Sequence, residues 1–572
     1  MTTAVEAARS LPGLLFALAV EAPDRPMLGY WREGGWRRMS RGEFAQKVAD
    51  VATGLRRLGV TAGERVLLVS ENRPEFIIAD AAIMAIGAVT VPTYVTNTVT
   101  DHAHILRDSG ARAAVTSTAA LAGRVLEGAA QASGLDLLVC IEPPPPCPSG
   151  TRAAAWSEFE AVPADIATLI AEVEQIPAGR LACLIYTSGT GGAPKGVMLP
   201  HRAMLSNCIS VHGLLRQLDL PENPRYLSFL PLSHAYEHTV GGFLLPSFGA
   251  EVVFSRGADR LLADFAEHQP HIVTAVPRLF EVIRERIRSQ VAKEGGWKER
   301  LFERAIALGL RRIDGPRLSL VERLEDAVLD RLVRRKVLAR FGGRMQAMVS
   351  GGARLDPDLS GFFIALGLPV IQGYGQTEAG PVISCNVPWD NQRRSVGRPL
   401  PGVTVKIAED GELLVQGMLV MDGYWNNPEA TASSLQGDPP WLHTGDVAEL
   451  QDGRIHITDR KRDFLKLKGG DMVAPAKIEA LLAGEPEIAQ VVAGGEGLAG
   501  VVALIVPAEG REAGVADAVK RVNAKLSTIE RIRRFTAVPE PFTVENGLMT
   551  PTMKVKRRQV LERYAAEVAA LT

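Results

Sequence analysis

Short apolar runs alternate with helix-like segments near the start of the chain, and this alternation restricts the possible folds more than any other feature. Residues 65–70 (RVLLVS), 88–92 (AVTVP) and 113–116 (AAVT) are apolar enough to form buried strands. Residues 43–58 carry apolar side chains at helical spacing, and residues 76–86 form a second helix-like stretch. Strands that alternate with helices indicate a parallel sheet with both faces covered, so the sequence predicts an α/β fold.

A long helical excursion is predicted at residues 282–344, where basic residues outnumber acidic ones. Its apolar side chains include a helically spaced set, namely Val321, Leu324, Val328 and Leu332. Two interpretations stay open. The excursion is either a solvated, charged helical hairpin or a basic surface for anionic lipid.

The chain becomes β-rich at residues 395–458, with strand-like runs at 403–407, 412–415 and 454–458. A charged stretch and a small α+β unit follow. We therefore predict a large N-terminal domain of parallel-rich sheets and helices at residues 1–458, which includes the excursion and the β-rich part. A small α+β C-terminal domain is predicted at residues 459–572.

Composition excludes several classes of protein. The formal net charge is −1, from 64 basic and 65 acidic residues, which argues against a dedicated nucleic-acid binder. Five cysteines without a C-x-x-C pair favour a reducing compartment over a disulfide framework or a structural zinc site. No apolar stretch reaches the roughly 18 residues of a membrane span, and no signal peptide is recognised. We expect a cytoplasmic protein, and peripheral contact with the inner face of a membrane stays open.

The strongest local motif is a glycine-rich loop with the sequence YTSGTGGAPKG at residues 186–196. It follows a strand-like run at 181–185, and its glycines let backbone N–H groups approach phosphate oxygens. Lys195 adds a positive charge, while Gly196 and Val197 after it exclude the Walker A pattern. On pattern alone, the alternative to phosphate binding is a flexible turn.

This loop resembles the phosphate loop of the AMP-forming superfamily of acyl-CoA synthetases, luciferases and adenylation domains. The superfamily usually has a second Thr where this chain has Gly191. The resemblance implies that ATP is contacted by Thr187, Ser188, Gly189, Thr190, Gly191, Gly192 and Lys195.

Two further motifs in the middle of the chain resemble the same superfamily. For GYGQTE at 373–378, the resemblance implies that Tyr374 stacks on adenine, Thr377 contacts the α-phosphate and Glu378 ligates Mg²⁺. A carboxylate beside phosphates suits this hard cation, and Thr187 is expected to share it. For SGGARL at 350–355, the resemblance implies a strand end beside the adenine and acyl pockets. It assigns Gly351 to the acyl pocket, and it assigns to ATP binding Gly352, Ala353, Gly373 and Gly375.

The C-terminal motifs resemble those of the superfamily in the same order. In LHTGD at 442–446, the resemblance implies that Asp446 accepts hydrogen bonds from ribose hydroxyls. In DRKRD at 459–463, Arg460 matches a ribose contact and Arg462 the hinge of a mobile small domain. Lys466 and Gly469 match the face presented to CoA during thioester formation, and near the end of the chain the catalytic lysine is matched by Lys554.

A competing motif, HAYEH at 234–238, fits the H-x-x-E-H pattern of inverted zinc proteases. Zinc binding would require both His side chains on one helix face and a third ligand. The preceding segment at 230–233 (LPLS) indicates a loop. The stretch also resembles the border of the acyl pocket, where it places His234. No G-x-S-x-G motif is present, which argues against a thioesterase or lipase.

Within the superfamily, VPRLF at 276–280 followed by the excursion resembles the long-chain fatty acid branch. The resemblance implies ATP-dependent activation of a long-chain fatty acid to acyl-adenylate and then to acyl-CoA. The expected substrates are fatty acid, ATP and CoA, and the expected cofactor is Mg²⁺. Three alternatives stay open: an aryl or bile acid substrate, a separate acyl carrier protein as acceptor, and a non-enzymatic lipid-binding scaffold. The sequence does not predict the oligomeric state.

Overall fold

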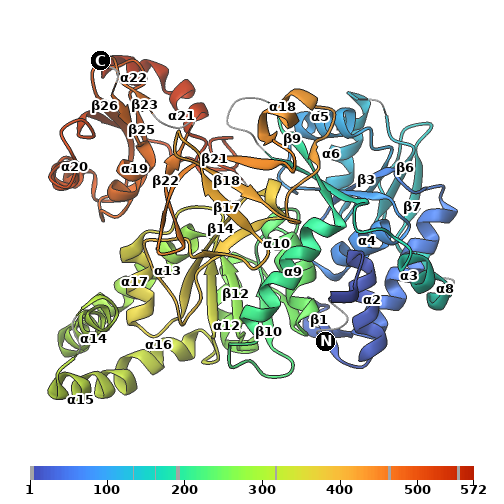
Figure 1. Cartoon of the computed structure of the whole chain (residues 1–572), viewed down its shortest axis with the longest axis horizontal. Helices are drawn as coiled ribbons and strands as arrows, with labels where there is room; N and C mark the ends of the chain where they lie inside the picture. The colour runs from blue at the N-terminus through green and yellow to red at the C-terminus, as the bar shows by residue number, and fades with distance from the viewer. Residues whose placement is uncertain are drawn as a thin grey trace. The chain divides into compact units, whose positions relative to one another are not determined.

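The computed structural model describes most of the chain, in several stretches (Figure 1). These are residues 6–132, 134–160, 163–187, 193–315, 318–461, 465–469, 471–550 and 554–571. Contacts divide the chain into two compact units. Unit 1 contains Met1–Val405 and Val415–Leu442, and unit 2 contains Lys406–Leu414 and His443–Thr572.

The first large sheet of unit 1 has eight strands in the order β19–β9–β8–β4–β3–β5–β6–β7. In that order they are Gly423–Tyr424, Lys195–Pro200, Leu181–Thr187, Val89–Thr93, Arg65–Val69, Ala113–Thr116, Leu137–Cys140 and Arg152–Ala155. All neighbours from β8 to β7 run parallel, whereas β9 is antiparallel to β8 and to β19. The apolar runs predicted as strands near the start of the chain are therefore the centre of a mostly parallel sheet.

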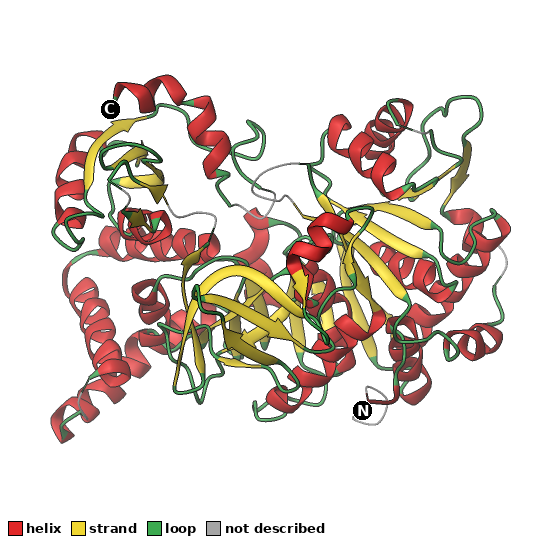
Figure 2. Cartoon of the chain, turned by 45° about the horizontal axis from the view of Figure 1, so that its top comes forward, coloured by secondary structure: helices red, strands yellow, loops and turns green. Residues whose placement is uncertain are grey.

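Helices connect the strands of this sheet and pack along it (Figure 2). Every residue of α4 is buried, which explains why its side chains, apart from Glu75 and Asp80, are apolar on all sides. The predicted helix at 43–58 is α3, and it begins with a capping box between Ser40 and Glu43. The helices are α2 Leu11–Glu21, α3 Arg41–Arg57, α4 Pro74–Ala85, α5 Val99–Ser109, α6 Ala119–Ala130, α7 Ser157–Glu160, α8 Ile166–Val173 and α9 His201–Leu215.

The second large sheet of unit 1 has nine strands in the order β16–β15–β14–β13–β12–β10–β11–β1–β2. In that order they are Arg398–Pro399, Val382–Cys385, Val370–Gly375, Ala347–Ser350, Ile272–Ala275, Arg225–Ser228, Glu251–Phe254, Pro26–Arg32 and Gly35–Ser40. The strands from β14 to β1 are parallel, and both edges are antiparallel. Parallel strands end at the same edge of a sheet, so β13 and β14 bring their following loops together.

The remaining helices of unit 1 outside the excursion are short. They are α10 Ala235–Thr239, the π-helix η1 Val240–Leu244, α11 Leu245–Ser247, the 3₁₀ helix η2 Ala258–Arg260, α12 Leu261–His268, α17 Pro357–Ala365, the 3₁₀ helix η4 Thr377–Ala379 and α18 Pro428–Ser434. Residues 230–233, which precede the HAYEH segment and α10, are not helical, as the sequence indicated.

The predicted excursion is a run of helices, confirming its helical character. It comprises α13 Pro277–Glu294, α14 Gly296–Asp314, α15 Leu320–Leu329, the π-helix η3 Asp330–Arg334 and α16 Arg335–Arg340. At Gly309, an added Cβ would lie 2.6 Å from Cα of Ala365, so glycine is needed for α14 to approach α17. No helix among the described residues is both long and apolar enough to cross a bilayer.

The β-rich segment forms a smaller sheet in the order β17–β18–β21–β20, with β22 paired to β21. These strands are Thr404–Ile407, Glu412–Gln416, Trp441–Gln451, Leu435–Gln436 and Arg454–Arg460. Unit 2 also holds a three-stranded sheet of β25 Ile488–Gly494, β26 Val501–Pro507 and β27 Ile532–Ala537, and a hairpin of β23 Leu465–Lys466 and β24 Met472–Val473. Its helices are α19 Pro475–Ala483, η5 Glu512–Gly514, α20 Val515–Asn523, α21 Arg557–Arg563 and α22 Ala565–Ala570.

Candidate active site

The glycine-rich motif begins at the end of β8 and finishes at the start of β9. Thr187 ends β8, Lys195 begins β9, and the two residues face each other in the antiparallel register. The side chain of Tyr186 donates a hydrogen bond to Asp108 (2.6 Å), which fixes the end of β8. Five positions predicted to contact ATP lie outside the described residues, namely Ser188, Gly189, Thr190, Gly191 and Gly192.

Tyr424 connects two of the predicted phosphate-side residues of unit 1. The Lys195 ammonium lies 4.9 Å from the centroid of the Tyr424 ring, where the ring quadrupole attracts a cation. The Tyr424 hydroxyl donates a hydrogen bond to Glu378 Oε1 (2.8 Å). β19 pairs with β9 and sets Tyr424 opposite Val197. The structure therefore gathers Lys195 and Glu378 around one aromatic side chain that sequence analysis did not identify.

The GYGQTE segment ends β14 and enters the 3₁₀ helix η4, which carries Thr377 and Glu378. Gly375 is required here, because an added Cβ would lie 1.9 Å from the carbonyl oxygen of Pro381. A Cβ at Gly373 would make only ordinary contacts, the nearest at 3.5 Å. Tyr374 is half-buried on the same strand.

The neighbouring strand β13 ends at Ser350, whose buried hydroxyl has no hydrogen-bond partner among the described residues. The next residue, Gly351, packs against an aromatic ring: an added Cβ would lie 2.8 Å from Tyr236. Gly352 adopts a positive φ of 78°, which favours glycine. Ala353 is exposed. The backbone after β13 is thus shaped by glycine at two successive positions.

The HAYEH segment directs its two histidine side chains to different partners. His234 caps α10, where its Nδ1 accepts a hydrogen bond from the Tyr236 amide (3.2 Å), and its ring centroid lies 6.5 Å from that of Tyr94. His238 Nε2 lies 3.1 Å from Asp80 Oδ2 in the interior. Among the described residues, no group of three or more His, Cys, Asp or Glu side chains is placed to hold a metal ion.

Glu237 is fully buried in a polar cluster. It accepts hydrogen bonds of 2.6–2.8 Å from three hydroxyl groups, those of Tyr226, Ser228 and Thr274. Burial raises the pKa of Glu237 to about 7, although these hydrogen bonds act in the opposite direction. The cluster joins α10 to β10 and β12, so it supports the segment that carries His234.

In unit 2, the strand pair β21–β22 places Asp446 opposite Arg460. The Arg460 Nε lies 3.2 Å from Asp446 Oδ1, and the Asp446 side chain is largely buried. The two residues predicted to contact ribose are therefore brought together by strand register. The predicted hinge residue Arg462 lies outside the described residues.

Glu412 anchors the LHTGD segment and was not identified from the sequence. Its buried carboxylate accepts hydrogen bonds from the Gly445 amide (2.8 Å), His443 Nδ1 (3.0 Å) and Lys461 Nζ (3.1 Å). Burial alone would raise the pKa of Glu412, but these three donors outweigh it and hold the pKa below its usual value. One carboxylate thus orients the turn that precedes Asp446. No sequence motif marks such a role for an acidic residue on a strand.

Lys554 also lies in unit 2, and the charges of Arg460 and Asp446 both affect its pKa. Its backbone amide donates to Thr550 Oγ1 (3.0 Å). The pKa of Lys554 is lowered to about 8: burial is the largest cause, the positive charge of Arg460 acts in the same direction, and Asp446 opposes both. Lys554, Asp446 and Arg460 therefore form one electrostatic cluster, although the lysine lies far from the other two in sequence.

Lys466 and Gly469 lie in the β23–β24 hairpin of unit 2. Both are exposed, and the Lys466 amide donates to Glu496 Oε2 (2.8 Å). An added Cβ at Gly469 would lie 3.3 Å from Asp471 Oδ2, which is a close contact, so a larger side chain would crowd this carboxylate. The structure keeps these two predicted CoA-side residues near one another.

Two family models match the chain. The model described as AMP-binding enzyme covers residues 15–425, and the model for the AMP-binding enzyme C-terminal domain covers residues 462–571. The chain belongs to the AMP-binding enzyme family. This result confirms the superfamily that the loop and the later motifs indicated.

Several curated family members align over nearly the whole chain. Long-chain-fatty-acid–CoA ligase FadD15 of Mycobacterium bovis is 34% identical, over 98% of this chain and 97% of that protein. Long chain acyl-CoA synthetase 7, peroxisomal, of Arabidopsis thaliana is 31% identical, over 93% of this chain and 81% of that protein.

Solved structures of AMP-binding enzymes share the fold. The A-PCP didomain of carboxylic acid reductase from Segniliparus rugosus, in complex with AMP, aligns with a TM-score of 0.77 and 21% identity, over 100% of this chain and 84% of that chain. O-succinylbenzoate Coenzyme A Synthetase from Bacillus subtilis, in complex with AMP, aligns with a TM-score of 0.71 and 21% identity, over 96% of this chain and 97% of that chain. These similarities confirm the predicted α/β fold class with a C-terminal domain.

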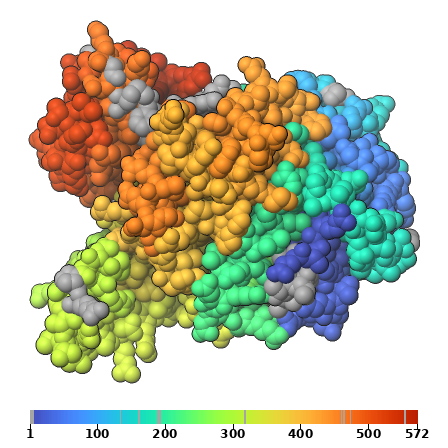
Figure 3. Space-filling model, viewed as in Figure 1, coloured from blue at the N-terminus to red at the C-terminus, as the bar shows by residue number. Residues whose placement is uncertain are grey.

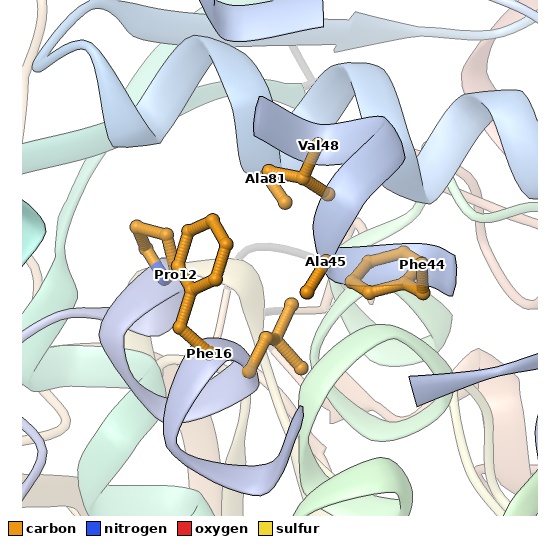
Figure 4. A pocket seen from close by; sticks show the side chains of 7 residues that line it. Pro12, Phe16, Phe44, Ala45, Val48 and Ala81 are labelled. Carbon is orange, nitrogen blue, oxygen red and sulfur yellow. The ribbon is translucent and has the colours of Figure 1, made fainter. Parts of the chain in front are cut away.

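A narrow apolar gap, too small to hold a water molecule, lies elsewhere in this AMP-binding enzyme, where α2, α3 and α4 meet (Figure 4). It is lined by Pro12, Leu15, Phe16, Phe44, Ala45, Val48 and Ala81. Because none of these side chains is charged or polar, the pocket offers no group that could bind phosphate or a carboxylate. We interpret it as a packing gap between helices.

Proposed function

We propose that this chain is an AMP-forming long-chain fatty acid–CoA ligase. The observation that carries the proposal is the alignment with long-chain-fatty-acid–CoA ligase FadD15, which spans nearly the full length of both proteins. The charged residues that the chemistry needs are present at the expected motifs, namely Lys195, Glu378, Asp446 and Lys554. Their presence argues against a non-enzymatic lipid-binding scaffold.

In the first half-reaction, a fatty carboxylate oxygen attacks the α-phosphorus of ATP. A carboxylate–phosphorus bond forms, the bond between the α-phosphorus and the bridging oxygen breaks, and pyrophosphate leaves. The carboxylate is ionised at neutral pH because carboxylic acids have pKa values near 4, so no general base is required. Catalysis then depends on positioning the reactants and neutralising charge.

Glu378 and Thr187 are the proposed Mg²⁺ ligands. Both supply oxygen atoms, which this cation prefers. Among the described residues, the only side chain bonded to the Glu378 carboxylate is Tyr424, through Oε1, so Oε2 is available to a cation. Bound Mg²⁺ would neutralise phosphate charge, while Lys195 and the glycine-rich loop would hold the leaving phosphates.

The remaining residues are assigned by their motifs and local geometry. Tyr374, Gly373, Gly375 and Thr377 would contact the nucleotide, and Asp446 with Arg460 would bind ribose. His234 and Gly351 would border the acyl pocket, and the backbone near Gly352 and Ala353 would border the adenine pocket. Lys554 would stabilise negative charge on the reacting carboxylate and α-phosphate.

In the second half-reaction, the CoA thiol loses its proton to solvent, its sulfur attacks the acyl carbonyl carbon, and the thioester C–S bond forms. The bond between that carbon and the phosphate oxygen breaks, and AMP leaves. A free thiol has a pKa near 8.5, so nearby positive charge would raise its thiolate fraction. We propose that residues 459–572 form a mobile C-terminal domain that turns about Arg462 and presents Lys466 and Gly469 to CoA.

The test is pyrophosphate and AMP release from ATP with palmitate, measured with CoA, with a phosphopantetheine-loaded acyl carrier protein, and with neither acceptor. The proposal expects palmitate-dependent pyrophosphate release and rapid palmitoyl-CoA formation. Preference for the carrier protein would reassign the acceptor. Absence of palmitate-dependent pyrophosphate release would refute the ligase assignment.

A further inference from the structure

The excursion of unit 1 carries an apolar ridge whose side chains stay exposed to solvent. The ridge consists of Leu320, Val321, Leu324, Val328 and Leu332 on α15 and η3, with exposed fractions of 78%, 75%, 73%, 55% and 44%. The opposite side of α15 is buried: Leu329 is 2% exposed and packs with Ala305 and Leu308 of α14. Helix α15 is therefore apolar on two sides, and only one of them is covered. The excursion, coloured yellow-green, lies at the surface of unit 1 in Figure 3.

The acidic and basic side chains of α15 and η3 differ in their pairing. The four acidic side chains are all paired with arginines, in the pairs Glu322–Arg311, Glu325–Arg304, Asp326–Arg334 and Asp330–Arg335. In contrast, Arg323 and Arg331 are exposed and form none of the ion pairs found among the described residues. The acidic charge is thus neutralised within the excursion, and unpaired positive charge remains outside.

The two unpaired arginines flank the ridge. Arg323 follows Leu320 by three positions, and Arg331 follows Val328 by three positions, a spacing that places side chains on adjacent turns of one helix face. The outer face therefore combines aliphatic side chains with cations and lacks unpaired carboxylates among its described residues.

The ridge is also held in place by contacts behind it. A capping box between Ser319 and Glu322 starts α15. The buried guanidinium of Arg334 donates to Ala365 O (2.7 Å), Ala305 O (3.0 Å) and Asp326 Oδ1 (2.6 Å). These bonds hold η3 against α14 and α17. The ridge is therefore already ordered in the free protein and need not fold when it binds a partner.

We propose that the ridge docks this protein on the surface of an anionic lipid bilayer. Helices that lie in a bilayer interface bury an aliphatic face among the acyl chains and place basic side chains at the anionic headgroups. The ridge offers this combination. A second copy of the chain fits less well, because a twofold contact across the ridge would bring Arg323 and Arg331 of both copies together.

The consequence for catalysis rests on the proposed function: long-chain fatty acids partition into bilayers, so docking would place the enzyme at its substrate. Lipid docking itself is tested without ATP, CoA or fatty acid. Its failure would therefore leave the ligase assignment intact, and failure of the ligase assignment would leave the docking test intact.

The experiment is sedimentation of the full-length protein with vesicles of phosphatidylglycerol and phosphatidylcholine in equal parts, compared with phosphatidylcholine alone. We expect binding to the anionic vesicles that weakens with added salt. The variant Arg323→Glu with Arg331→Glu should lower the partition coefficient about tenfold or more. Leu324→Ser with Val328→Ser should lower it by a similar factor, because both aliphatic anchors are lost.

Matched controls change exposed residues elsewhere. Met418→Ser removes an apolar side chain that is 58% exposed, and Lys520→Glu reverses an exposed charge. Both should bind vesicles as the unmodified protein does. Melting temperatures verify that every variant folds. Equal vesicle binding by the ridge variants would overturn the proposal. So would a dimer, seen by light scattering, that only the ridge variants lose.

Discussion

At the scale of single residues, unit 1 organises its predicted phosphate side around Tyr424. The hydroxyl holds Glu378 and the ring faces the Lys195 ammonium, so one side chain restrains two charged groups of opposite sign. Motif comparison identifies Lys195 and Glu378 because each lies within a short signature. Tyr424 and Glu412 escape such a comparison, because their roles arise only when distant segments of the chain meet.

Two substitutions at Tyr424 test its contacts with Glu378 and Lys195 separately. Tyr424→Phe removes the hydrogen bond to Glu378 and keeps the ring beside Lys195. Since a hydrogen bond to a charged group contributes roughly 1.5–3 kcal/mol, we expect kcat/KM for ATP to fall about tenfold or more. The Mg²⁺ concentration that gives half-maximal pyrophosphate release should also rise.

Tyr424→Leu removes both contacts and should be slower than Tyr424→Phe under the same assay. Trp389→Leu, at an exposed aromatic residue, serves as a control and should behave like the unmodified enzyme. If Tyr424→Phe keeps both its kcat/KM and its Mg²⁺ dependence, Tyr424 does not position Glu378.

The lowered pKa of Lys554 predicts a pH dependence for adenylate formation. Only the protonated ammonium stabilises negative charge, and it is lost as pH rises through the folded-state pKa of about 8. Single-turnover pyrophosphate release without CoA should therefore be about tenfold slower at pH 9 than at pH 7. Lys554→Arg keeps a permanent charge, so its slower reaction should be flat over this range.

Lys554→Ala distinguishes the two half-reactions. Adenylate formation should slow by about 10²-fold, the scale of one lost electrostatic donor. Thioester formation from synthetic acyl-adenylate should persist. Equal losses in both half-reactions, or the same pH profile in Lys554→Arg, would contradict this role.

At the scale of elements, apolar periodicity locates helices and strands but does not say which face is covered. The strands β3, β4 and β5 were predictable because runs such as 65–70 are apolar throughout, which suits a sheet buried on both faces. On α15, the regular spacing of Val321, Leu324 and Val328 correctly indicates a helix. Those side chains nevertheless face outward, and the inner side of η3 holds Arg334, which hydropathy would place in solvent.

The buried Arg334 predicts a local loss of stability. Arg334→Leu would leave the carboxylate of Asp326 with only the longer contact to Arg312 (3.3 Å) and would remove donors from three backbone carbonyls. Breaking a buried ion pair from one side costs about 3 kcal/mol or more, so urea unfolding should begin at a lower concentration. Hydrogen exchange should accelerate first in residues 320–340.

Arg331→Leu is the matched control, since Arg331 lies in the same π-helix and is exposed. Its unfolding midpoint should stay close to that of the unmodified protein, as for most surface substitutions. Similar midpoints for both variants would show that the Arg334 bonds add little.

At the scale of the whole molecule, contacts join segments that the linear sequence separates. Residues 406–414 group with residues 443–572 because Glu412 binds the turn before Asp446 and the carboxylates of Asp410 and Glu412 both pair with Lys461. Composition alone shows only a change near residue 459 where charged residues begin. The order of the family motifs was readable from sequence, whereas this grouping required the strand pairing of the fold.

The proposed rotation of the C-terminal domain predicts a selective defect. Proline fixes φ near −65° and removes a backbone donor, so Arg462→Pro should restrict rotation about that residue. Adenylate formation should be retained, and palmitoyl-CoA formation should fall. Arg462→Ala, which leaves the backbone free, should support both half-reactions. Unchanged thioester formation in Arg462→Pro would move the hinge to another residue.

The proposed long-chain substrate predicts a steep dependence on acyl length. Each methylene transferred from water to an apolar site contributes about 0.8 kcal/mol, so eight further carbons could add up to about 6 kcal/mol. Ordering of the chain opposes this gain, yet a third of it would still separate palmitate from octanoate by more than tenfold in kcat/KM. Measured below the micelle threshold, palmitate or oleate should therefore outcompete octanoate, benzoate and cholate. A tenfold preference for octanoate or an aromatic acid would refute the long-chain assignment and leave the ATP chemistry intact, because adenylate formation does not depend on what lies beyond the carboxylate.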